Sequence, residues 1–148
     1  MKKIFLSSVM VFLISSNLWA AQNEESKQIV GNMTIIVSGL KNNNGNVKIG
    51  LFNSKESYNG DSQLFKGANI KIENKQVKWE VKNIPFGEYA IKAFHDEDID
   101  DKMDTNFLGI PTESYGFSNN AKARFGPPSF DEAKFYFDTQ DMQIDIEF

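Results

Sequence analysis

The feature that most constrains the fold of this chain is a strict alternation of apolar and polar residues at 77–82. Val77, Trp79 and Val81 fall on one side of an extended backbone, and three charged residues fall on the other. A period of two is typical of a β-strand with one buried face and one solvated face. Similar short apolar segments occur at 33–38, 47–51, 70–72, 88–94, 135–137 and 142–148. The sequence therefore predicts about seven short strands.

Residues that favour turns separate these segments. The sequence Asn-Asn-Asn-Gly at 42–45 is a strong turn signal, because Asn and Gly both tolerate positive φ, and we expect it to join the first two strands as a hairpin. Ser129 precedes Glu132 by three residues, which is a capping-box signature and predicts one helical turn through Ala133. We therefore predict an all-β fold, an antiparallel β-sandwich of the immunoglobulin/transthyretin-like kind. It would carry one long ordered loop at 105–128 and at most one helical turn.

The first twenty residues have the composition of a secretory signal peptide. Two lysines precede an apolar run at 4–14, and a polar segment then ends at Ala20, where we expect cleavage. The apolar run is too short to span a bilayer, so we expect no membrane span after cleavage. The predicted organisation is a signal peptide at 1–20, a flexible leader at 21–30 and one β-sandwich domain at 31–148. The protein would be periplasmic or secreted.

Charge and cysteine content narrow the function classes. Loss of Lys2 and Lys3 with the signal peptide leaves 14 basic and 20 acidic residues, a net charge of −6. Such a surface argues against nucleic acid or anionic lipid as a partner. The chain has no cysteine, so an exported domain must be held by its core or by its core and a metal. Thirteen phenylalanines provide apolar area for that core. We expect the protein to be a monomer.

The densest group of charges follows the strand at 88–94. Six of the nine residues at 96–104 are acidic, and several are spaced two apart, as in calcium loops of the EF-hand type. We predict that calcium binds the backbone carbonyl of Lys102 and the side chains of Asp96, Asp98, Asp100 and Asp104. Two positions depart from the pattern: Asp101 replaces the usual Gly, and Phe107 replaces the closing Glu. Glu113 is the residue we expect to fold back and close the site. The alternatives are a solvated acidic turn without an ion and a magnesium site.

His95 is the only histidine, and it lies next to this acidic loop. The simplest interpretation is a hydrogen bond that holds the loop against the sandwich. A small-substrate hydrolase using His95 with neighbouring carboxylates is the alternative, although the sequence contains no nucleophile elbow or phosphate loop. We predict a non-catalytic binding or structural module of the cell envelope. The aromatic residues between 107 and 130 would either fix the long loop to the sandwich or form a platform for a protein or glycan partner.

Three segments together resemble a known family. Residues 83–89 resemble the turn and strand of transthyretin-like and carboxypeptidase-regulatory-like sandwiches. Residues 95–120 and 126–133 are similar to the bacterial exported family called domain of unknown function 2141. The resemblance covers nearly the whole chain after the signal peptide. It implies an exported single-domain sandwich, and the family has no established reaction.

Overall fold

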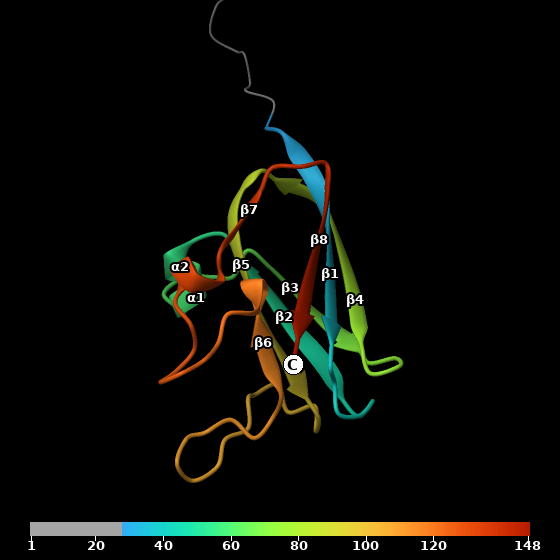
Figure 1. Ribbon diagram of the computed structural model, residues 1–148, viewed down its shortest axis with the longest axis vertical. Helices are drawn as coiled ribbons and strands as arrows, with labels where there is room; N and C mark the ends of the chain where they lie inside the picture. The colour runs from blue at the N-terminus through green and yellow to red at the C-terminus, as the bar shows by residue number, and fades with distance from the viewer. Residues whose placement is uncertain (1–27) are drawn as a thin grey trace, which may run out of the picture.

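The structure is a computed structural model that describes residues 28–148. The predicted signal peptide and most of the predicted leader lie outside these residues. The first sheet has the strand order β4 (Val77–Pro85), β1 (Val30–Ser38), β8 (Asp141–Glu147). The second has the order β3 (Lys66–Lys71), β2 (Asn46–Phe52), β5 (Gly87–Asp96), β6 (Tyr115–Phe117), and β7 (Phe135–Phe137) also pairs with β5. Figure 1 shows the two sheets facing each other, which confirms the predicted all-β sandwich.

Two details of strand pairing differ from the predictions. The predicted hairpin of the first two strands is wrong, because β1 and β2 lie in different sheets and residues 39–45 cross between them. The sandwich is also not wholly antiparallel, since β1 and β8 are parallel, with Ile35 opposite Ile144. The reason is the same in both cases. Alternation identifies the buried face of a strand, but it does not specify the partner or the direction.

The core lies between the two sheets and follows the predicted alternation. Met33, Ile35 and Val37 of β1 are fully buried, and they face buried residues of β2 and β5 such as Leu51 and Ile91. Burial of each large aliphatic side chain contributes roughly 1.5–3 kcal/mol. This core fixes β5, and the acidic loop begins at its end.

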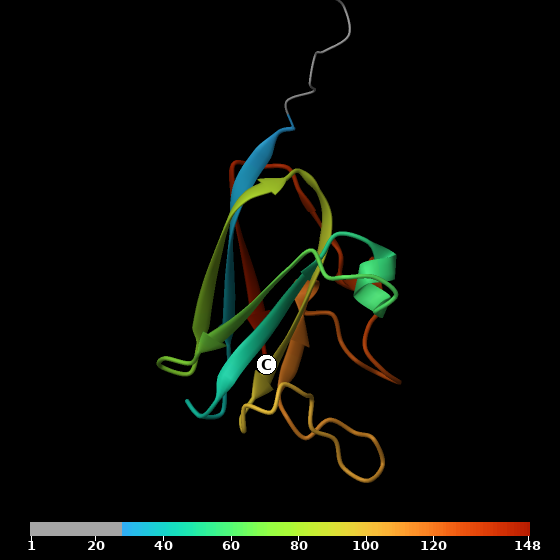
Figure 2. The same ribbon diagram turned by 180° about the vertical axis from the view of Figure 1, so that it is seen from behind.

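A second apolar cluster lies outside the second sheet, where short helices pack against β5. These are α1 (Lys55–Asn59), the 3-10 helix η1 (Ser118–Asn120) and α2 (Phe130–Ala133). Figure 2 shows α1 beside the long strands, from behind. The capping box of α2 is confirmed: the Ser129 hydroxyl accepts from the Glu132 amide, and the Glu132 carboxylate accepts from the Ser129 amide. Because α1 is also present, the limit of one helical turn was too low.

Buried polar contacts hold this helical cluster to the sheet. The Ser118 hydroxyl donates to the Ala133 carbonyl at 2.5 Å and accepts from the Ile91 amide at 2.8 Å. The Tyr58 hydroxyl donates to the Pro128 carbonyl at 3.0 Å. Burial, and then the negative charge of a nearby glutamate, raises the pKa of Tyr58 to about 12. No helix within residues 28–148 is long and apolar enough to cross a membrane.

Candidate functional site

The acidic loop is organised around Asp96, the last residue of β5. Its side chain is fully buried, and its two carboxylate oxygens accept hydrogen bonds from the amides of Asp100 and Asp101, each at 3.2 Å. The chain therefore turns back over Asp96 within five residues. Asp101 takes a left-handed conformation with φ of 71°, at the position where the calcium-loop pattern has glycine. Aspartate tolerates this conformation better than most residues, so the turn forms without glycine.

A lysine from another strand neutralises the inner part of this loop. The Lys48 ammonium forms an ion pair with Asp101 and lies 3.8 Å from the Asp96 carboxylate. The hydrogen bond to Asp101 is the main cause that raises the pKa of Lys48. Sequence reasoning did not identify Lys48, and the side chain of Lys102, the lysine within the loop, is exposed. A period-two pattern could not reveal the contact, because Lys48 is brought close only when β2 pairs with β5.

The outer part of the loop gathers three further carboxylates. Glu113 returns to the acidic loop, where its two oxygens accept hydrogen bonds from the Glu97 amide at 2.9 Å and the Asp104 amide at 3.0 Å. Its side chain is only 8% exposed. Carboxylate oxygens of Asp98, Asp104 and Glu113 lie within 4.8 Å of one another. We call these three residues the outer carboxylate cluster.

The electrostatics of the outer carboxylate cluster are unbalanced. Desolvation, followed by the charges of Asp98, Glu113 and other acidic neighbours, raises the pKa of Asp104 above its usual value. Among residues 28–148, no lysine, arginine or histidine nitrogen lies within 4.0 Å of the cluster's carboxylates. Three close carboxylates without a protein cation form an arrangement that a divalent cation would stabilise.

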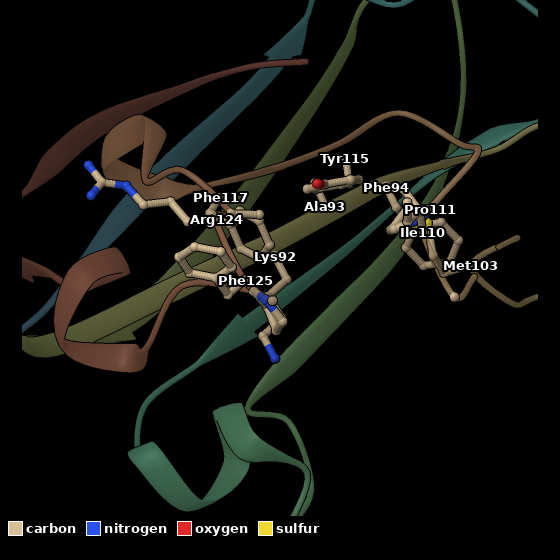
Figure 3. A pocket seen from close by; sticks show the side chains of 14 residues that line it. Lys92, Ala93, Phe94, Met103, Ile110, Pro111, Tyr115, Phe117, Arg124 and Phe125 are labelled. Atoms are coloured by element: carbon tan, nitrogen blue, oxygen red, sulfur yellow. The ribbon is translucent and has the colours of Figure 1, made fainter. Parts of the chain in front are cut away.

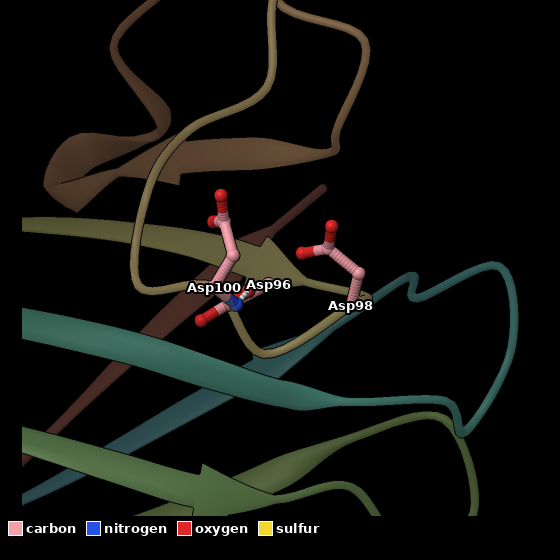
Figure 4. A group of neighbouring side chains, drawn as sticks. All are labelled: Asp96, Asp98 and Asp100. Carbon is pink, nitrogen blue, oxygen red and sulfur yellow. Dashed lines mark hydrogen bonds between the residues drawn. The ribbon is translucent and has the colours of Figure 1, made fainter.

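A second group overlaps the first. Asp96, Asp98 and Asp100 also place carboxylate oxygens within 4.8 Å of one another, and Asp98 is common to both groups. Figure 4 shows the carboxylates of Asp98 and Asp100 on the same side of the turn. The structure thus places the five carboxylates that the sequence proposed in two overlapping groups of three. For Lys102 it shows the amide donating to the Asp100 carboxylate at 2.8 Å, and a role for its carbonyl stays a prediction.

His95 supports the neighbouring turn. It is fully buried, and its Nε2–H donates to the Asn44 carbonyl at 2.7 Å, so it braces residues 39–45 instead of the acidic loop itself. The adjacent Gly45 has φ of 64°, and an added Cβ would overlap the Asp96 carbonyl oxygen. His95 Nδ1 lies 3.8 Å from a Glu97 carboxylate oxygen. A substrate would have to reach a fully buried ring, which counts against the hydrolase alternative.

The phenylalanines between 107 and 130 divide into two sets. Phe117 and Phe130 are buried in the helical cluster and fix the loop, whereas Phe107 and Phe125 are almost entirely exposed. Phe125 borders a groove of about 620 Å³. Its walls come from residues 92–94 of β5, residues 123–127, and Met103, residues 109–111, Tyr115 and Phe117. Sequence reasoning did not identify this groove, because its walls are distant in the sequence.

Comparisons with known proteins give a family but no function. The family model described as "Uncharacterized protein conserved in bacteria (DUF2141)" matches residues 35–145. No protein with a curated description matches the sequence. Among solved structures, a mutant of a pilus-presented adhesin is similar at 14% identity and a TM-score of 0.24, covering 83% of this chain and 28% of its own. That score is too low to support a structural argument.

Proposed function

The chain belongs to the bacterial family of uncharacterised proteins DUF2141, and we propose that it is a non-catalytic, calcium-binding β-sandwich module. The observation that carries the proposal is the outer carboxylate cluster, three convergent carboxylates without a counter-cation among the described residues. As a binding or structural module of the cell envelope, it would act on a protein or glycan partner outside the cytoplasm.

The donor set suits calcium better than other cations. Calcium takes six to eight oxygen ligands from flexible segments, whereas zinc favours the nitrogen and sulfur donors that this site lacks. Glu113 is already held by two backbone amides, so its remaining lone pairs face the cluster at little further entropic cost. Asp98 and Asp104 would supply the mobile ligands, and loop carbonyls and water would complete the shell. Magnesium usually retains more water and uses fewer protein ligands.

Bound calcium would join the turn that follows β5 to the start of the long loop. Asp98 belongs to the turn that follows β5, whereas Asp104 and Glu113 bracket residues 105–112. Neutralisation of the three charges would remove the repulsion that favours separation of these parts. The ion would therefore order the segment that projects from the sandwich, and this ordering would present a binding surface.

Calcium titration against thermal unfolding tests the proposal. The melting temperature should rise with calcium and fall again when chelator is added, since a ligand that binds only the folded state stabilises it. The double variant Asp98→Asn/Asp104→Asn should lose this rise. Asp138→Asn should keep it, because Asp138 is exposed and forms no side-chain hydrogen bond or ion pair within residues 28–148. No calcium-dependent shift in the wild type would exclude the site. A larger shift with magnesium would reassign the metal.

Export is tested separately. Cleavage after Ala20 would make Ala21 the first residue of the protein recovered from the periplasmic or extracellular fraction, which N-terminal sequencing measures. Recovery of the uncleaved chain in the cytoplasmic fraction would contradict export without affecting the calcium proposal.

A further inference from the structure

The groove beside the long loop differs in chemistry from the rest of the molecule. Only three of its lining residues carry a polar side chain, namely Lys92, Tyr115 and Arg124, and none carries a carboxylate or an amide. The chain as a whole has a net charge of −4. An apolar groove with two positive charges on an acidic protein therefore indicates a ligand with an apolar body and a negative group.

Lys92 is the residue best placed to bind the negative group. It lies half-buried on β5, and its ammonium donates to the Tyr58 carbonyl at 2.6 Å and lies 3.9 Å from the centre of the Tyr58 ring. An ammonium has three donors, so this hydrogen bond leaves two for a ligand. Within residues 28–148 no carboxylate lies within 4.0 Å of it, and burial lowers its pKa. The carbonyl and the rings of Tyr58 and Phe52, the latter 5.4 Å away, stabilise the ammonium but do not neutralise its charge, so an anionic ligand could still pair with it.

The shape of the groove indicates how the apolar part of the ligand would lie. Figure 3 shows Lys92 and Phe125 at one end, and Met103 and Ile110 at the other, with Tyr115 between them. In the same view the Arg124 side chain extends away from the groove, whereas the Lys92 ammonium lies at the edge of the groove, where it contacts Tyr58 of α1. Phe125 and Ile110 are exposed. An apolar chain that lay between them would bury apolar surface of both side chains, which is favourable.

We propose that this groove binds a small acyl carboxylate, with the carboxylate paired to Lys92 and the acyl chain lying along the apolar wall toward Ile110 and Met103. The volume of about 620 Å³ is within the range of small-molecule sites. A glycan would need several hydrogen-bonding side chains, which this lining does not provide. The inference goes beyond the proposed calcium function and does not depend on it, because no residue that lines the groove belongs to the outer carboxylate cluster.

Isothermal titration calorimetry with decanoate below its micelle concentration tests the proposal. We expect one saturable site and a weaker affinity for decanol, by tenfold or more, since decanol lacks the charge that pairs with Lys92. Lys92→Met should bring the affinities for decanoate and decanol close together. Lys41→Met removes an exposed lysine elsewhere and should leave both affinities unchanged.

A second variant keeps the proposal testable if Lys92→Met does not fold. Phe125→Ser changes a fully exposed side chain, so it should fold normally and weaken decanoate and decanol binding by a similar factor. Absence of saturable decanoate binding to the folded wild type would overturn the proposal, as would equal affinity for decanoate and decanol. Cosedimentation with phosphatidylglycerol vesicles without decanoate binding would also overturn it and would identify a lipid surface as the occupant.

Discussion

Substitution of Glu113 by glutamine separates a structural role of this residue from a metal-binding role. The carboxylate is buried, and each of its oxygens accepts a backbone amide hydrogen. A glutamine side chain has the same shape, but it replaces one acceptor oxygen with an NH₂ group. That group would face a backbone N–H, so one of the two hydrogen bonds would be lost.

Two opposing effects set the stability of Glu113→Gln without calcium. A hydrogen bond to a charged acceptor contributes about 1.5–3 kcal/mol, so its loss is destabilising. Removal of the charge also relieves repulsion with Asp98 and Asp104, but water screens this repulsion because both partners are exposed. The hydrogen-bond loss is therefore the larger effect, and we expect a net destabilisation of about 1–2 kcal/mol in chelator.

Calcium should enlarge the difference in stability between the wild type and Glu113→Gln. At a concentration of about 100 times Kd, calcium stabilises the wild type by roughly 2.7 kcal/mol, and a variant without the closing ligand should gain much less. For a domain of this size that corresponds to a rise in Tm of roughly 8–12 °C in the wild type. Scanning calorimetry of both proteins in chelator and in calcium measures all four values. Glu73→Gln, an exposed change outside the outer carboxylate cluster, should behave as wild type.

The calcium response of Glu113→Gln decides whether Glu113 is a ligand. If calcium raises the Tm of Glu113→Gln as much as that of the wild type, Glu113 is a structural hydrogen-bond acceptor and not a ligand. If Glu113→Gln is more stable than the wild type in chelator, charge repulsion outweighs the lost hydrogen bond, and the order of magnitudes above is wrong.

Three further predictions concern stability. Gly45→Ala should cost at least about 3 kcal/mol in urea unfolding, because it adds a backbone clash to a left-handed conformation; a loss below 1 kcal/mol would contradict this geometry. Ser118→Ala should cost about 2–4 kcal/mol because two buried backbone groups lose their partner, whereas exposed Ser62→Ala should change little. Burial makes Tyr58 favour its neutral form when folded, so the stability that comes from its raised pKa of about 12 is present below pH 10 and is lost toward pH 12. Tyr58→Phe should therefore be less stable than the wild type by about 1 kcal/mol at pH 8 and show a smaller loss in alkali, measured by denaturant unfolding; parallel pH curves would exclude the effect.

The parts of the fold that were predictable are those encoded locally. Alternating burial identified strands such as β4, and the spacing of Ser129 and Glu132 identified α2, because each signal lies within a few residues. Strand partners were not predictable, since β1 would bury the same face beside β2 as beside β8. Helix α1 was missed because its signals, a Ser54 cap and a closing Gly60, lie in a polar segment without apolar periodicity.

The residues of the candidate sites also divide into those that the local sequence reveals and those that only the fold brings together. The carboxylates at 96–104 were evident because six of these nine residues are acidic, and Glu113 was proposed because a closing acid was missing. Lys48 and Lys92 were not identified, because each acquires its role only when β2 pairs with β5 or when α1 packs against the sheet. Residues brought together by tertiary structure leave no periodic signal in the sequence.

The two proposed sites share one segment, and this sharing has a thermodynamic consequence. Residues 105–111 form a small hairpin in which the Asn106 carboxamide oxygen accepts the amides of Leu108 and Ile110. One end joins the outer carboxylate cluster through Asp104, and Ile110 lines the groove. If calcium fixes the ends of this hairpin, less conformational freedom is lost when a carboxylate binds against it, so calcium should tighten decanoate binding. Linkage requires decanoate to tighten calcium binding by the same factor, and typical couplings are about 5- to 150-fold. Calorimetry of each ligand with and without the other measures both factors. Equal decanoate affinity in calcium and in chelator would show that the hairpin's own hydrogen bonds already order the wall, and the two sites would then act independently.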